Sequence, residues 1–129
     1  MEPSLIGDCP SSPNCVSSRA ADRDHRIDPI PLGPVTPAAA WELIEQALAK
    51  EPRLRVADRR RAQWYLRAEA ASRIFGFVDD VEFQIDPDRN LVEIRSASRV
   101  GYWDLGVNRR RVERLRETLR ASGLRSEHG

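Results

Sequence analysis

Three groups of residues in this 129-residue chain carry side chains that could do chemistry. Cys9 and Cys15 enclose five residues, and His25 follows ten positions later. A thiol pair at this spacing could form a structural disulfide, remain reduced, respond to redox conditions, bind a metal or supply a nucleophile. Cys-x5-Cys is not a recognised zinc spacing, and no oxyanion feature or third orienting group can be identified beside His25. We therefore expect structural thiols or a disulfide, a surface or capping histidine, no metal and no catalytic residue.

The second group is a pair of adjacent carboxylates, Asp79 and Asp80. Neighbouring residues on a strand point to opposite faces, so these two carboxylates could not easily share a proton or a metal ion. We predict that they act in salt bridges, together with Asp104.

The third group is a set of arginines that begins with Arg95 and Arg99 and ends with the run 109–111. A helix N-terminus carries partial positive charge, so each Arg in the first turn costs roughly a few tenths of a kcal/mol. The compensating anion could be one of the three carboxylates above, or an external phosphate, carboxylate or acidic partner bound at the helix start. The external alternative gives a candidate anion-binding set of Arg95, Arg99, Asn108, Arg109 and Arg110.

Two helices are predicted to position these groups. Thr36 is an N-cap candidate with Pro37 at the first helical position, and the apolar stripe that follows ends before Pro52. The second helix is predicted to start near Asn108, as its N-cap, and to stop at Gly123.

Alternation of apolar and polar residues predicts about four strands between the helices, over 54–56, 62–70, 80–86 and 91–97. The cluster at 87–90 predicts a turn that makes the last two strands a hairpin. Each strand has one apolar face, which amphipathic helices can cover. The expected fold is therefore α+β, a two-layer sandwich of about four antiparallel strands covered by two helices.

The chain divides into three parts by composition. Residues 1–35 hold six of the nine prolines without helical or strand periodicity, and we predict an irregular N-terminal arm that contains the Cys pair. Residues 25–35 carry apolar side chains that could anchor this arm to the core. Residues 36–123 are predicted to form a single α+β domain, and residues 124–129 a disordered tail.

Charge is distributed unevenly between the hairpin and the last helix. Residues 77–94 contain six carboxylates and one Arg, whereas residues 108–125 contain seven Arg and two Glu. An acidic hairpin and a basic helix of equal and opposite net charge are expected to be neighbours in the fold.

Four stretches together resemble a known family: 9–18, 77–83, 95–101 and 104–111. In this order they are similar to the family named domain of unknown function 1499, found in bacteria and photosynthetic eukaryotes. The resemblance covers about residues 9–120 and includes both cysteines. It implies a domain without an established reaction.

Tyr102 and Trp103 lie in the loop between the last strand and the last helix. They could form an exposed contact patch, or Trp103 could fold back over the core. The sequence does not choose between these two positions.

Composition argues against several classes of protein. The chain has 21 basic and 20 acidic residues, a balance that argues against nucleic-acid binding. No run approaches the roughly 18 apolar residues that span a bilayer, and residues 1–8 do not resemble a secretory signal. We expect a soluble, cytoplasmic protein without a membrane span or cofactor.

The function favoured by these observations is a non-catalytic binding or interaction module. Its working surface would be the Arg-rich loop and helix start, and its partner a small anionic ligand or an acidic protein. The alternative is a thiol-based redox or metal-dependent protein centred on Cys9 and Cys15.

Overall fold

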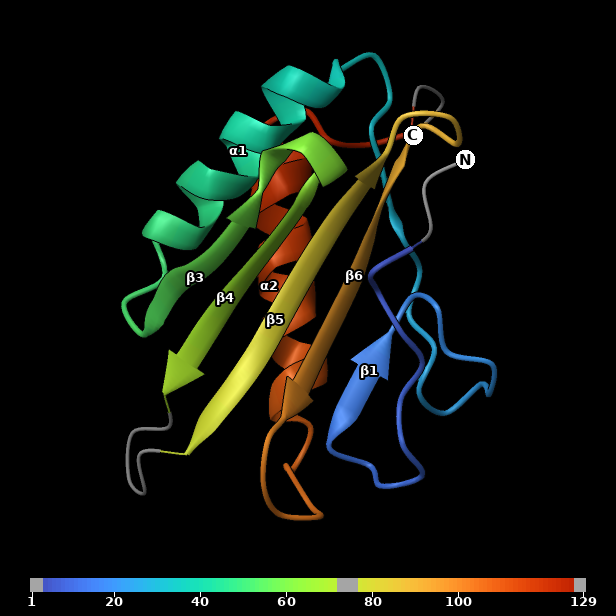
Figure 1. Ribbon diagram of the computed structural model, residues 1–129, viewed down its shortest axis with the longest axis vertical. Coiled ribbons are helices and arrows are strands. Elements are labelled where there is room, and N and C mark those ends of the chain that lie inside the picture. The colour runs from blue at the N-terminus through green and yellow to red at the C-terminus, as the bar shows by residue number, and fades with distance from the viewer. Residues whose placement is uncertain (1–3, 72–76, 127–129) are drawn as a thin grey trace.

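The fold is an antiparallel sheet with two helices lying against one of its faces (Figure 1). The computed structural model describes residues 4–71 and 77–126. In chain order the elements are β1 (Cys15–Ser17), β2 (Ile30–Pro31), α1 (Pro37–Ala49), β3 (Leu54–Arg60), the 3-10 turn η1 (Arg61–Gln63), β4 (Tyr65–Ala71), β5 (Val78–Asp86), β6 (Leu91–Ser98) and α2 (Val107–Ala121).

The strands follow the order β1-β6-β5-β4-β3, and β2 also pairs with β6. All of the pairings between these strands are antiparallel, which confirms the α+β class. The sheet has six strands instead of the expected four or so. The two additional strands, β1 and β2, come from the arm and span three and two residues, too few to show a period in the sequence.

Helix α1 begins and ends as its sequence predicts. The Thr36 hydroxyl oxygen accepts a hydrogen bond from the Ala39 amide at 3.2 Å, and Pro37 occupies the first turn. The helix buries one stripe, which includes Trp41 and Leu48, against the sheet.

The hairpin of β5 and β6 forms the centre of the sheet. Phe83 lies opposite Ile94 in register, and both side chains are buried in the core. Asn90 closes the turn with φ 57°, a left-handed conformation that Asn adopts more readily than most residues.

The second strand was predicted to start at residue 62, which is too early. Residues 61–63 form the 3-10 turn η1, and Trp64 follows with φ 58°, so β4 starts at Tyr65. The Arg61 guanidinium lies 4.0 Å from the centre of the Trp64 ring and covers it. The prediction began the strand too early because Ala62 and Trp64 continue the apolar alternation of the strand. Their backbone conformation, however, is that of a turn.

Most of the described arm lies against the domain. Ile6, Ile27, Ile30 and Leu32 are buried, so anchoring is not confined to residues 25–35. Leu124, the first residue of the predicted tail, is buried in the core. Residues 127–129 of that prediction lie outside the described residues.

Candidate functional site

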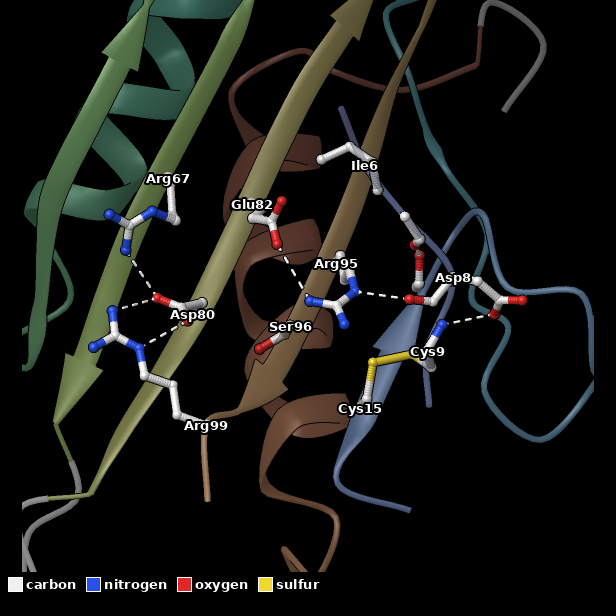
Figure 2. A network of polar contacts seen from close by, with 12 residues as sticks. Ile6, Asp8, Cys9, Cys15, Arg67, Asp80, Glu82, Arg95, Ser96 and Arg99 are labelled. Carbon is white, nitrogen blue, oxygen red and sulfur yellow. Dashed lines mark hydrogen bonds and ion pairs between the residues drawn. A yellow bond between two sulfur atoms is a disulfide. The ribbon is translucent and has the colours of Figure 1, made fainter. Parts of the chain in front are cut away.

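Cys9 and Cys15 form a disulfide that ties the arm to the edge of the sheet (Figure 2). Cys15 lies on β1, opposite Ala97 of β6. The arm is also held by the Ser17 hydroxyl, which donates a 2.6 Å hydrogen bond to the Gly7 carbonyl. Both sulfurs are therefore used in a covalent link. Across residues 4–71 and 77–126, no group of three or more His, Cys, Asp or Glu side chains could hold a metal ion.

His25 connects two parts of the arm. Its Nδ1 lies 2.6 Å from an Asp22 carboxylate oxygen, and its Nε2 lies 2.8 Å from the Ser12 carbonyl oxygen. The hydrogen bond with Asp22 raises the pKa of His25, and the Ser12 carbonyl adds to this effect. Both ring nitrogens face acceptors, so the protonated imidazole is the form that satisfies both. His25 therefore holds two parts of the arm together.

Arg95 and Arg99 lie on the face of the sheet opposite the helices (Figure 2). Arg99 makes a two-bond contact with Asp80 on β5, at 2.8 and 2.9 Å, and also reaches Glu69 on β4. Arg95 pairs with Glu82 at 3.3 Å and donates to the Asp8 carbonyl of the arm. Carboxylates of the same sheet face therefore neutralise both guanidiniums.

These contacts form one network across the open sheet face. Arg67 also donates to Asp80, at 2.9 Å. Hydrogen bonds from Arg99 lower the pKa of Asp80, and those from Arg67 add to the effect against the opposing influence of burial. Glu82 is the next residue of β5 on the same face, and it accepts a hydrogen bond from the Tyr65 hydroxyl. Burial raises the pKa of Tyr65 well above its usual range. The lowered pKa keeps Asp80 ionised at pH 7, so its contacts with Arg67 and Arg99 are ion pairs.

A second, buried network joins the start of α2 to the sheet. Arg111 donates to Asp79 of β5 at 2.9 Å, and their side chains are only 11% and 13% exposed. Arg111 also donates to Ser96 and to the Oδ1 of Asn108, which is itself fully buried. This ion pair links the acidic hairpin to the basic helix.

Asn108 is a connector in this network and not the helix N-cap. Its Oδ1 also accepts from Ser96, and its Nδ2 donates to the Asn14 carbonyl, to Ser98 and to Asp104. Helix α2 starts at Val107, with Gly106 at the N-cap position, two residues before the predicted cap. The buried amide therefore joins the arm, β6 and α2.

Asp104 supplies the cap that Asn108 was expected to supply. Its carboxylate accepts from the Gly106 amide at 2.8 Å and from the Asn108 amide at 3.2 Å. Leu105 and Gly106 both have positive φ, 54° and 77°. A Cβ added to Gly106 would lie 2.9 Å from Arg110, whose guanidinium donates to the Leu105 carbonyl at 2.8 Å. The backbone of this turn is thus held from both sides.

Residues 100–107, which we call the apolar loop, present large apolar side chains to solvent. The loop projects beyond the end of β6 and the start of α2 (orange in Figure 1). Trp103 is 74% exposed and Leu105 is 85% exposed, and three other large side chains are also exposed: Val100, Tyr102 and Val107. Tyr102 and Trp103 contact each other edge to face, with ring centres 4.9 Å apart. Of the two alternatives for these aromatics, the exposed patch is the one observed.

A cleft of about 330 Å³ separates the apolar loop from the arm. Its walls are formed by Pro13, Val16, Asp24, Trp103, Asp104, Leu105, Gly106 and Arg109. Arg109 donates to the Asp24 carbonyl at 2.9 Å across this cleft. In the described part of the chain, neither Arg109 nor Arg110 forms an ion pair with a carboxylate.

The predicted anion-binding residues do not come together in one place. Arg95 and Arg99 lie on the open sheet face, Asn108 is buried in the network, and Arg109 and Arg110 lie at the start of α2. Among the predicted salt-bridge partners, Asp79 and Asp80 form ion pairs on opposite faces of β5, and Asp104 caps the helix.

Ser96 and Ser98 belong to the buried network and were not identified from the sequence. The signal for them was present, because Ser96 follows Val92 and Ile94 in the inward-facing phase of β6. A hydroxyl at an inward position needs a buried hydrogen-bond partner. For Tyr102 and Trp103 the sequence offered an exposed patch as one of two alternatives and could not choose between them, since exposure depends on what packs over a side chain.

The comparison with protein families agrees with the resemblance of the four stretches. The family model described as "Protein of unknown function (DUF1499)" matches residues 5–119. The chain belongs to the DUF1499 family. No curated protein matches the chain. The match to this family begins in the arm and ends within α2, so it spans the disulfide, the open-face network and the buried network.

Neither helix in the described part of this DUF1499 chain is long and apolar enough to cross a bilayer.

Proposed function

We propose that this DUF1499 protein is a non-catalytic binding module that uses the apolar loop and the start of α2 to bind an anionic partner. The observation that carries the proposal is the pairing of an exposed apolar loop with two arginines, Arg109 and Arg110, for which the described chain supplies no counter-carboxylate. An exposed contiguous apolar surface is typical of an interaction site.

The proposal retains only part of the predicted anion-binding set. Arg95 and Arg99 already contact carboxylates, and the Asn108 amide uses its donors and acceptor within the fold. Arg109 and Arg110 each donate to a backbone carbonyl and have further N–H groups that can bind phosphate or carboxylate oxygens.

The thiol-based alternative is less well supported. Both sulfurs are joined in a disulfide, and the side chains that a metal site requires do not gather in the described chain. We therefore place the binding surface at the apolar loop and assign the disulfide to the scaffold.

Inorganic phosphate is a direct probe of the two arginines. A ligand that binds only the folded state raises the melting temperature, and the effect grows with the logarithm of ligand concentration above the Kd. Phosphate should therefore stabilise the protein more than chloride at equal ionic strength. The double variant Arg109→Gln with Arg110→Gln should lose this effect.

The matched control is Arg114→Gln with Arg120→Gln. It removes the same charge from the exposed side of the same helix, where each Arg already pairs with a Glu. An equal response to phosphate and chloride, or an equal loss in the control variant, would reject the anion-binding proposal.

A further inference from the structure

We infer that the partner of the apolar loop is the surface of an anionic lipid membrane, into whose interfacial region Trp103 and Leu105 insert. This inference rests on the proposed function and names the chemical class of the partner. It follows from the shape of the loop, its side chains, its rigidity and the position of its charges.

The shape of the loop favours a lipid surface. Leu105 and Trp103 are the most exposed large apolar side chains of the described chain, and the loop projects from one end of the molecule (Figure 1). A partner that buries projecting side chains must surround them. A bilayer interface does so without a preformed pocket, because lipid chains adapt to the inserted group.

The side chains of the loop match the layers of that interface. Trp and Tyr are enriched at the level of the lipid headgroups, where an apolar ring and a polar N–H or O–H are both accommodated. Tyr102 and Trp103 lie side by side in the loop, and Leu105 extends the apolar surface. The single loop thus combines headgroup-level aromatics with an aliphatic side chain for the acyl boundary.

The loop is held in its exposed conformation before any partner binds. Asp104 accepts two backbone hydrogen bonds on one side of the turn, and Arg110 donates to the Leu105 carbonyl on the other. Leu105 keeps a left-handed backbone while its side chain contributes almost nothing to the core. A loop that is already ordered loses little entropy on binding.

The charges next to the loop complement an anionic surface. Arg109 and Arg110 follow it directly on the first turn of α2, and the described residues provide them with no ion-pair partner. Arg99, at the other end of the loop, is 44% exposed beside its carboxylates. Lipid phosphates can bind the first two guanidiniums while the apolar side chains insert.

The test measures cosedimentation of the full chain with two kinds of vesicle, one of phosphatidylcholine alone and one equimolar in phosphatidylcholine and phosphatidylglycerol. We expect binding to the anionic vesicles that weakens as salt is raised. Tryptophan emission should shift to the blue on binding. Trp103→Phe should remove that shift, because Trp41 and Trp64 pack against each other at the core.

The decisive variant is Trp103→Ser with Leu105→Asn. Asn tolerates the left-handed backbone of position 105, so the variant removes apolar surface without requiring a new turn. We expect at least about a tenfold loss of vesicle binding with an unchanged fold, since two exposed apolar anchors are removed. Arg109→Gln with Arg110→Gln should weaken binding to anionic vesicles, and Arg114→Gln with Arg120→Gln should have a much smaller effect.

Three outcomes would overturn the inference. They are no binding to either vesicle, binding that the loop variant leaves intact, and a loop-dependent dimer in sedimentation velocity, which would identify a second copy as the occupant. Phosphate stabilisation without vesicle binding would overturn the membrane inference and leave the anion-binding proposal standing. Vesicle binding that is insensitive to the Arg109 and Arg110 variant would instead reject the role of the arginines.

Discussion

Arg111 on α2 and Asp79 on β5 form an ion pair at 2.9 Å in which both side chains are largely buried between the helix and the sheet. The pair joins the basic segment 108–125 to the acidic segment 77–94. It also fixes the start of α2, and with it the base of the apolar loop.

Breaking this pair on one side should destabilise the protein strongly. Asp79→Asn or Arg111→Met each leaves a buried charge without its partner, and we expect a loss of about 3–5 kcal/mol in the free energy of unfolding. Urea denaturation measures the change. The exposed pair of Arg120 and Glu117 is the control, and Arg120→Met should cost less than about 1 kcal/mol. Similar losses at the two pairs would contradict the structural role of burial.

Asn108→Ala should also be costly, because the amide bonds to groups of the arm, of β6 and of the loop before α2. Each buried polar group left without a partner costs about 1–3 kcal/mol, so we expect a total loss of at least about 2 kcal/mol. Thermal and urea denaturation measure it. Thr118→Ala is the comparison, since its exposed hydroxyl only donates to the preceding turn of its own helix. A neutral effect at Asn108 would show that water replaces its contacts.

Reduction of the Cys9–Cys15 disulfide should lower the free energy of unfolding by about 2 kcal/mol, the loop-closure entropy expected for so short a loop. The measurement is urea denaturation with and without reductant, and Cys9→Ser with Cys15→Ser should reproduce the reduced protein. Hydrogen exchange should increase first in residues 4–9, which the bond holds across the sheet. If the exchange of these amides is unchanged, the hydrogen bonds of the arm are sufficient to hold it.

The disulfide bears on the predicted cytoplasmic location. Such bonds persist in oxidising compartments and are rare in a reducing cytosol. The location stays a prediction, and titration of thiols in protein taken directly from cells would test it.

His25 should make the stability of the arm depend on pH. The pKa of His25 is raised in the folded protein by Asp22 and the Ser12 carbonyl, with a smaller contribution from the charge of Asp24. A raised pKa stabilises the fold fully below the unfolded value of about 6.5, and this stabilisation is lost as pH rises through the folded pKa. The same hydrogen bond lowers the pKa of Asp22. The contribution of Asp22 to stability is therefore lost only as the solution becomes acidic.

Denaturation at pH values on both sides of the His25 transition measures this effect, and NMR titration in a His128→Gln background assigns it. His25→Gln should remove the difference between mildly acidic and mildly alkaline solution. An unshifted His25 titration would contradict the contact with Asp22.

Leu105→Asn should raise stability while it weakens binding. Leu105 has φ 54° and is 85% exposed, so it pays the strain of a left-handed backbone without gaining burial. The left-handed conformation costs most residues roughly 1–2 kcal/mol, and Asn relieves part of that strain because its short polar side chain can hydrogen-bond locally. Thermal denaturation should therefore show a small increase in melting temperature. A decrease would indicate that the Leu105 side chain stabilises the free protein.

Gly106→Ala tests the other half of the turn. Its φ is 77°, and an added Cβ would lie within 2.9 Å of the Arg110 guanidinium. The positive φ and the close approach to Arg110 both disfavour a Cβ at this position. Gly106→Ala should therefore lower the melting temperature, whereas Leu105→Asn should raise it.

Local patterns in the sequence determined the parts of the fold that depend on neighbouring residues. The N-cap at Thr36, the apolar stripe of α1 and the alternation of β5 and β6 all act within a few residues, because helix and strand periods are local properties. The same alternation separated Asp79 from Asp80, and the structure places them on opposite faces of the sheet. The DUF1499 family was likewise recognisable from four short stretches.

Contacts between distant segments decided the rest. Strands β1 and β2 exist only because β6 supplies their hydrogen bonds, and the two-residue β2 has no pattern of its own. Arg99 pairs with Glu69, thirty residues away, because β4 and β5 are neighbours in the sheet. The distribution of charge along the sequence does not reveal that strand order. Exposure of Trp103 and Leu105 is decided in the same way. A side chain is buried only if another part of the chain packs over it, and that packing is a property of the whole tertiary structure.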